Sequence, residues 1–81
     1  MSTVVKALGC RFQIHSDDHG DPHCHIVGQG SAIKVSLTSF EVLGDTEFSE
    51  RDAKRLIEIV RKYQKELLAK WKDYHGKTEE S

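Results

Sequence analysis

The chain has 81 residues, with 12 Lys and Arg against 13 Asp and Glu, which gives a formal net charge of −1. A chain of this length forms one small domain and leaves no room for a second hydrophobic core. Its hydrophobic fraction of 37% is that of a folded protein and excludes general disorder. The near-zero net charge excludes a strong long-range attraction to nucleic acid or to an anionic membrane.

Two cysteines, Cys10 and Cys24, are too few for a disulfide scaffold. The N-terminal residues lack the charged start and apolar run of a signal peptide, and no apolar run approaches the ~18 residues of a membrane span. We therefore expect a cytoplasmic protein with reduced thiols and no membrane contact.

Strand patterns fill the first half of the chain. Apolar residues alternate with polar ones from Leu8 to His15, which predicts one strand over 5–15. Turn-forming residues then predict a loop over 16–22. Further strands are predicted over 23–27, 31–37 and 40–43. Together they predict a three- to four-stranded antiparallel meander.

The last third of the chain changes to a helical period. Ser49 stands at the position of an N-cap, with Asp52 three residues later. Apolar residues follow at spacings of three and four until Gly76, which predicts one long C-terminal helix of some 26 residues. We expect a single α+β domain over 1–76, with the helix packed against the meander, followed by a polar C-terminal tail over 77–81.

Such a helix would be about 39 Å long, whereas short strands span ~17–20 Å. Either the helix breaks, or its far end packs on the N-terminal segment or on a partner chain. We favour a partner, either a second copy of this chain or a small cognate protein. The predicted interface consists of apolar residues near the helix end, namely Leu67, Leu68, Trp71 and Tyr74.

Four of the five histidines lie between residues 15 and 25. On a strand, His23 and His25 project from one face and Cys24 from the other. Clustered imidazoles and carboxylates would suit Zn²⁺ or another divalent transition metal. The candidate ligands are His19, His23 and His25, with His15, Asp18 and Asp21 as additional ones.

Two other interpretations of this stretch stay open. The histidines could serve only to hold the loop through hydrogen bonds to its backbone and carboxylates. Alternatively, His19, His23 and His25 could hold a divalent ion or share a proton in a metal-dependent or histidine-based hydrolase or nuclease, with Asp18 orienting one imidazole. We expect Cys24 to face the core as an inert thiol, so no residue here is a convincing nucleophile.

The outer side of the predicted helix carries a basic strip. We interpret this strip as a solvated face with ion pairs between residues four apart, such as Glu58 and Lys62. Contact with an RNA backbone is the alternative. The strip consists of Arg51, Lys54, Arg55, Arg61, Lys62 and Lys65, interrupted by Glu58 and Glu66.

Two motifs resemble a known family. The first is Asp18-His19-Gly20-Asp21-Pro22-His23-Cys24-His25, and the second is Glu66-Leu67 followed by Trp71 near the helix end. Together they resemble the small bacterial domain-of-unknown-function family 4160, over most of the chain. The resemblance implies the α+β fold and the importance of these residues, and it implies pairing with a second small protein in a module of toxin–antitoxin type. It implies no particular reaction.

Overall fold

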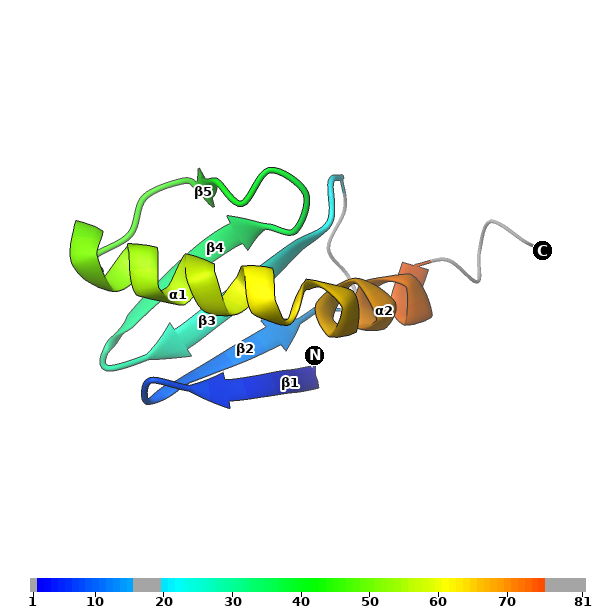
Figure 1. Cartoon of the computed structure of the whole chain (residues 1–81), viewed down its shortest axis with the longest axis horizontal. Coiled ribbons are helices and arrows are strands. Elements are labelled where there is room, and N and C mark those ends of the chain that lie inside the picture. The colour runs from blue at the N-terminus through cyan, green and yellow to red at the C-terminus, as the bar shows by residue number, and fades with distance from the viewer. Residues whose placement is uncertain (1, 16–19, 76–81) are drawn as a thin grey trace.

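The protein is a two-layer α+β domain, described here by a computed structural model for residues 2–15 and 20–75 (Figure 1). Five antiparallel strands form one sheet in the order β1-β2-β3-β4-β5, and two consecutive helices follow. The elements are β1 (Ser2–Ala7), β2 (Cys10–Ile14), β3 (His23–Gly28), β4 (Ser31–Ser36), β5 (Val42–Leu43), α1 (Glu50–Lys62) and α2 (Gln64–His75). The predicted α+β class and antiparallel meander are confirmed.

The single strand predicted over 5–15 is wrong, because the chain reverses in the middle of it. Leu8 and Gly9 have φ angles of 55° and 71°, and positive φ at both central residues is the backbone of a tight two-residue hairpin turn. Leucine rarely adopts this conformation, which is why the alternating pattern does not predict a turn here. The Gln29 side-chain amide donates a 2.7 Å hydrogen bond to the Leu8 carbonyl oxygen. The result is a fifth strand, β1, at the edge of the sheet.

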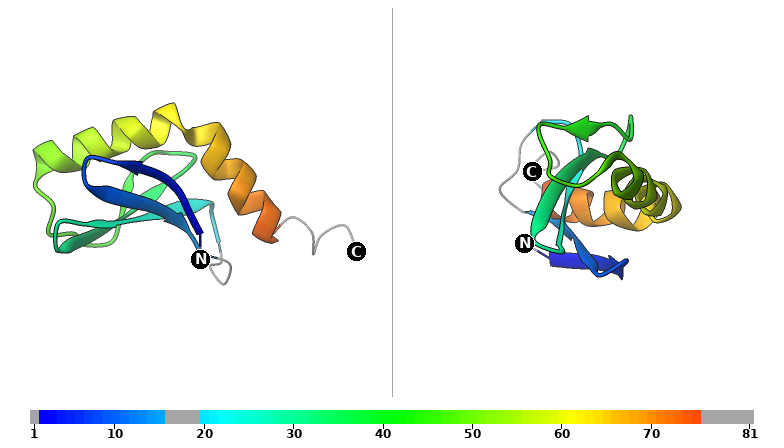
Figure 2. Two further views of the ribbon diagram at one scale, coloured as in Figure 1. Left: turned by 90° about the horizontal axis from the view of Figure 1, so that it is seen from below. Right: turned by 90° about the vertical axis from the view of Figure 1, so that its left-hand side faces the viewer.

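The strand register assigns the side chains of the sheet to two faces. Phe12 pairs with Ile26, which pairs with Ile33, and all three are buried. The helices cover this face, because the buried residues of both helices join the same core as these strand residues (Figure 2). In the described part of the chain, the helices leave most of the opposite face uncovered, and we call it the open face. Helix α2 reaches this face only at one end, where Trp71 contacts His23.

Helix α1 begins as the sequence predicts. The Ser49 hydroxyl accepts a 3.2 Å hydrogen bond from the Asp52 backbone N–H. Since an N-cap satisfies a backbone donor that has no partner within the helix, it fixes where the helix starts. Ala53, Leu56 and Val60 then lie on one side of α1 and are buried against the sheet.

The single long helix is also wrong, because the helix breaks at Tyr63. Tyr63 has φ −107° and ψ 21°, and α2 starts at the next residue. The Gln64 side-chain amide donates a 2.7 Å hydrogen bond to the Leu37 carbonyl oxygen and so ties the break to the sheet. No proline or glycine lies at the break, which is why the sequence pattern did not reveal it.

The break turns α2 toward the end of the sheet, where it contacts β1 and β2 (Figure 2). Leu67 is 0% exposed and Trp71 is 7% exposed, while Leu68 and Tyr74 are half-buried against the same core. The structure therefore shows two of the alternatives stated for the end of the helix: the helix breaks, and its second part packs on the N-terminal strands β1 and β2. The partner chain stays a prediction, although two of the four residues assigned to it lie in the chain's own core.

In the described part of the chain, neither helix is both long and apolar enough to cross a membrane. The predicted tail over 77–81 and the predicted end of the helix at Gly76 lie outside the described residues.

Candidate functional site

Three of the four clustered histidines meet at one end of the sheet. His15 directly follows β2, and His23 and His25 lie on β3. Because Gln13 pairs with His25, the chain direction brings His15 diagonally onto the same face as His25. The His15 and His25 rings are stacked, with centroids 3.8 Å apart and planes at 9°. The His23 ring lies 5.2 Å from that of His25. We call these three side chains the histidine cluster.

His23 is the anchor of the cluster. Its ring centroid lies 5.1 Å from that of Trp71 on α2, and the residue is only 8% exposed. Its Nδ1 atom lies 2.9 Å from the backbone carbonyl oxygen of Asp21. A carbonyl oxygen can only accept, so this bond places a proton on Nδ1 and fixes the orientation of the ring. For His23, therefore, the structure supports the interpretation in which a histidine holds the loop.

His15 carries an unusual feature for a half-buried residue. Its Nε2 atom is buried without a hydrogen-bond partner among the described residues. Leaving a buried polar atom unpaired costs about 1–3 kcal/mol, and such atoms are rare in folded proteins. In the described structure, the His15 ring is therefore held in the cluster by stacking on His25, without a hydrogen bond to this nitrogen.

The other candidate metal ligands are not brought to the cluster by the described structure. The Asp21 side chain is exposed, and only its backbone carbonyl contacts the cluster. Asp18 and His19 lie outside the described residues. Among the residues that the structure describes, no three His, Cys, Asp or Glu side chains are arranged to hold one metal ion. Metal binding stays a prediction.

Cys24 points away from the histidine cluster, as predicted from the strand alternation. It is 0% exposed in the core, and burial raises the pKa of its thiol to about 12. A thiol with such a pKa is neutral at physiological pH and a poor nucleophile. The prediction that Cys24 faces the core is confirmed.

The open face of the sheet carries a positive patch that the sequence reasoning missed. Lys6, Arg11 and Lys34 are exposed, and the register places all three on this face. Lys34 pairs directly with His25, so the patch continues into the histidine cluster. No Asp or Glu occurs in β1, β2, β3 or β4. This absence of acidic residues from four consecutive strands could have been noticed in the sequence.

Acidic residues lie near both ends of the open face. At the histidine end, the Glu41 carbonyl oxygen accepts a 2.9 Å hydrogen bond from the backbone N–H of Ser36, the strand partner of His23. At the far end, Asp45 and Glu47 line a shallow hollow together with Arg11 and the β3–β4 hairpin. The Thr46 hydroxyl donates a 2.8 Å hydrogen bond to the Ala32 carbonyl oxygen and so holds this loop at the sheet. The positive patch is therefore bordered by carboxylates and has none within its four strands.

The basic strip of α1 is solvent-exposed, as predicted, but its side chains interact differently. Lys62 Nζ lies 5.6 Å from the centroid of the Tyr63 ring, and Arg61 lies 4.8 Å from that of Phe40. The predicted ion pair between Glu58 and Lys62 is not formed between these two described side chains. Unlike the open face, this strip has carboxylates interspersed along it, which reduces its local positive potential.

Comparisons with known proteins identify one relationship. A family model described as Domain of unknown function (DUF4160) matches residues 9–72. Neither the curated proteins nor the solved structures gave a match. Because the family model spans well over half of the chain and includes β2, the histidine cluster and most of α2, the chain belongs to the DUF4160 family.

Proposed function

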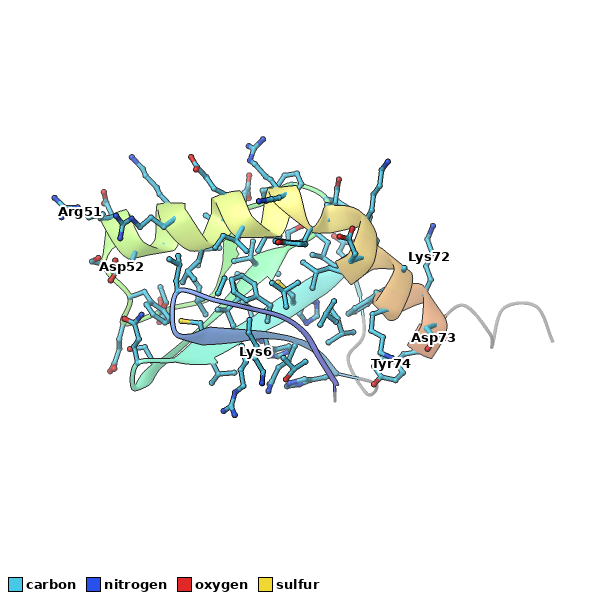
Figure 3. The ribbon with its side chains drawn as sticks, turned by 60° about the horizontal axis from the view of Figure 1, so that its bottom comes forward. Lys6, Arg51, Asp52, Lys72, Asp73 and Tyr74 are labelled. Carbon is cyan, nitrogen blue, oxygen red and sulfur yellow. The ribbon has the colours of Figure 1, made fainter. Side chains whose placement is uncertain are left out.

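We propose that this protein binds single-stranded RNA on the open face of its sheet. The observation that carries the proposal is the positive patch, in which Lys6, Arg11 and Lys34 are exposed on β1, β2 and β4. None of the four strands β1 to β4 contains a carboxylate. Figure 3 labels Lys6 in the sheet layer, and Arg51 and Asp52 at the start of α1 in the helical layer. Because the positive patch lies on strands, the proposed RNA contacts the sheet and not the helices.

A net charge of −1 does not oppose this proposal. Exposed charges separated by more than about 10 Å are largely screened at 0.1 M salt, so the local patch decides the interaction and not the sum over the molecule. The described acidic residues of the first half, Asp21, Glu41, Asp45 and Glu47, lie outside the strands, and the charged residues of β1 to β4 are all cations. A phosphate backbone is the ligand that this distribution suits.

The form of the surface favours a single strand over a duplex. A five-stranded sheet is too broad to enter a groove of a double helix, which admits a helix or a two-stranded ribbon. Proteins that bind single strands combine a positive surface with rings on which bases stack. Here the rings are imidazoles, of which His15 and His25 are half-buried at the end of the positive patch.

The experiment compares two sets of lysine and arginine substitutions of equal charge change. Fluorescence anisotropy would measure the affinity for a labelled mixed-sequence RNA at several salt concentrations. We expect Lys6→Gln, Arg11→Gln and Lys34→Gln together to weaken binding and to flatten its salt dependence, by a slope of about 0.7 for each phosphate that is no longer neutralised. The control set on the helices is Lys54→Gln, Lys62→Gln and Lys65→Gln. Loss of binding in the control set instead would assign the RNA to the helices and overturn the proposal.

A partner protein, the first expectation from the sequence, receives less support from the described structure. The half of the predicted interface formed by Leu67 and Trp71 lies in the core. The free edge of β1 is a poor template for another strand, because its register is irregular between Thr3 and Val5 and Lys6 is exposed. Light scattering of the purified chain would test the homodimer, which requires twice the mass of 9.2 kDa.

A further inference from the structure

The end of the open face far from the histidines carries the hollow that is lined by Arg11, Asp45, Glu47 and the β3–β4 hairpin. We propose that this hollow binds one guanine base of the RNA and so gives the protein a sequence preference. This inference rests on the proposed function, because the positive patch must first hold the phosphate backbone beside the hollow. It adds to that function which base is recognised and which side chains recognise it.

The floor of the hollow is made of small residues. Val27 pairs with Ala32 across β3 and β4, and both line the hollow. Gly28 and Gly30, which also line it, contribute backbone alone. The volume of the hollow is about 630 Å³, which lies within the range of small-ligand sites. A flat base can therefore lie over the apolar atoms of the hairpin while its edge faces the rim.

The rim of the hollow presents two carboxylates, those of Asp45 and Glu47. Thr46 lies between them, and its hydroxyl donates a 2.8 Å hydrogen bond to the Ala32 carbonyl oxygen. This bond fixes the loop at the sheet, so the two carboxylates on either side of Thr46 are held beside the floor. Among the described side chains, no ion pair joins Arg11 to either carboxylate. All three charged groups are therefore available to a ligand.

The charges around the hollow decide which part of the RNA enters it. Asp45 and Glu47 would repel a phosphate group, because like charges repel each other. Arg11 lines the same hollow and belongs to the positive patch, so it can hold the phosphate of the nucleotide whose base is bound. The backbone of the RNA then follows the patch, and the hollow receives a base.

A carboxylate at the rim favours guanine over the other three bases of RNA. An ionised carboxylate only accepts hydrogen bonds, and its two oxygens can accept from two neighbouring donors. Guanine presents two adjacent donors on its Watson–Crick edge, the ring N1–H and the N2 amino group. Adenine and cytosine present one amino group beside an unprotonated ring nitrogen, and uracil presents one N–H between two carbonyl oxygens. Each of these three bases would therefore place an acceptor against the carboxylate, and single-stranded RNA leaves this edge accessible for such reading.

The experiment uses fluorescence anisotropy to compare labelled oligouridine with the same oligomer carrying one guanosine, inosine, adenosine or cytidine at a fixed position. We expect the guanosine oligomer to bind about 10-fold more tightly than those with adenosine, cytidine or uridine alone. Inosine keeps the N1–H and lacks the amino group, so its oligomer should bind with intermediate affinity.

The variant that tests the rim is Asp45→Asn with Glu47→Gln. An amide presents a donor beside its acceptor, so the variant should lose the guanosine preference. It should bind oligouridine at least as tightly as the wild-type chain, because two negative charges are removed from the edge of the positive patch. The matched control of equal charge change, Glu58→Gln with Glu66→Gln on the helices, should keep the guanosine preference.

Each other outcome has a definite meaning. If the wild-type chain binds all five oligomers equally or prefers another base, the guanine inference is overturned and the proposed function stands. If it binds none of them, both fail. A guanosine preference that survives in Asp45→Asn with Glu47→Gln, or that disappears in the control, also overturns the inference, because the base is then recognised elsewhere. Retained binding of oligouridine shows that the rim variant is folded, and loss of that binding would mean that the carboxylates support the whole RNA surface and do not select a base.

Discussion

The two faces of the sheet differ sharply although the same strands form both. Phe12, Ile26 and Ile33 make one row across three strands of the covered face, and each is at most 3% exposed. One residue along, Arg11, Val27 and Ala32 make the neighbouring row of the open face, with Arg11 and Ala32 exposed and Val27 half-buried. The covered row holds the domain together, which leaves the open row free to bind a ligand.

The largest effect on stability should come from the covered row. We expect Phe12→Ala to lower the free energy of unfolding by about 3–5 kcal/mol, because it leaves a cavity at a fully buried position. Gln13→Ala, one residue along on the open face, should change it by less than about 0.5 kcal/mol. Urea unfolding of both variants is the measurement, and equal losses would contradict the distinction between the faces.

The same comparison extends to α2, which covers the end of the sheet. Leu67 is fully buried and its neighbour Leu68 is half-buried. We expect Leu67→Ala to cost about 2–5 kcal/mol and Leu68→Ala clearly less, because only the first leaves a closed cavity. Thermal unfolding would rank the two. A larger loss in Leu68→Ala would mean that α2 presents a different side to the sheet.

Cys24 provides a prediction on pH, because its thiol is neutral in the covered face. Burial raises its pKa from 9.0 to about 12 in the folded state. Between these values, the unfolded state loses the proton and the folded state keeps it, so stability falls as the pH rises from about 9 toward 12. At pH 10, the loss is on the order of 1 kcal/mol. Cys24→Val should lack this component when unfolding is measured at pH 7 and pH 10, and an identical pH dependence would count against it.

Leu8 lies outside the covered face, at a turn where its side chain contributes little. It is 45% exposed and has a φ of 55°, a conformation that costs a leucine about 1–2 kcal/mol. Asparagine tolerates this conformation, so we expect Leu8→Asn to raise the free energy of unfolding by about 1 kcal/mol. Gln29→Asn is the control at the other turn with the same backbone. It should not stabilise, because it shortens the side chain that donates to the Leu8 carbonyl oxygen.

The smallest effect on stability should come from the positive patch. We expect Lys34→Gln to change the free energy of unfolding by less than about 0.5 kcal/mol, since Lys34 is exposed and the described structure places no carboxylate in β1 to β4 beside it. The same variant should weaken RNA binding. Chemical unfolding and fluorescence anisotropy on one preparation would measure both, and a destabilised Lys34→Gln would mean that the open face also supports the fold.

The candidate site was only partly predictable. Alternation along the strand was enough to place His23 and His25 on one face and Cys24 on the other, and the structure confirms both. The stacking of His15 on His25 depends on the register between β2 and β3, in which Gln13 pairs with His25 and Cys10 with Gly28 across the intervening loop. The contact between His23 and Trp71 joins residues nearly fifty positions apart, and no local pattern encodes it.

The sequence by itself determined the features that arise from near neighbours: the alternation of the strands, the start of α1 at Ser49 and the apolar stripe of the helices. Only the tertiary structure decided where the chain turns at Leu8 and where the helix breaks at Tyr63. Gly9 suits the turn, but Leu8 beside it does not, and no proline or glycine lies at the break. Contacts between distant parts of the chain stabilise both changes. At the turn, the Gln29 amide donates to the Leu8 carbonyl oxygen, and at the break, the Gln64 amide donates to the Leu37 carbonyl oxygen. Burial of Leu67 and Trp71 at the end of the sheet also stabilises the break.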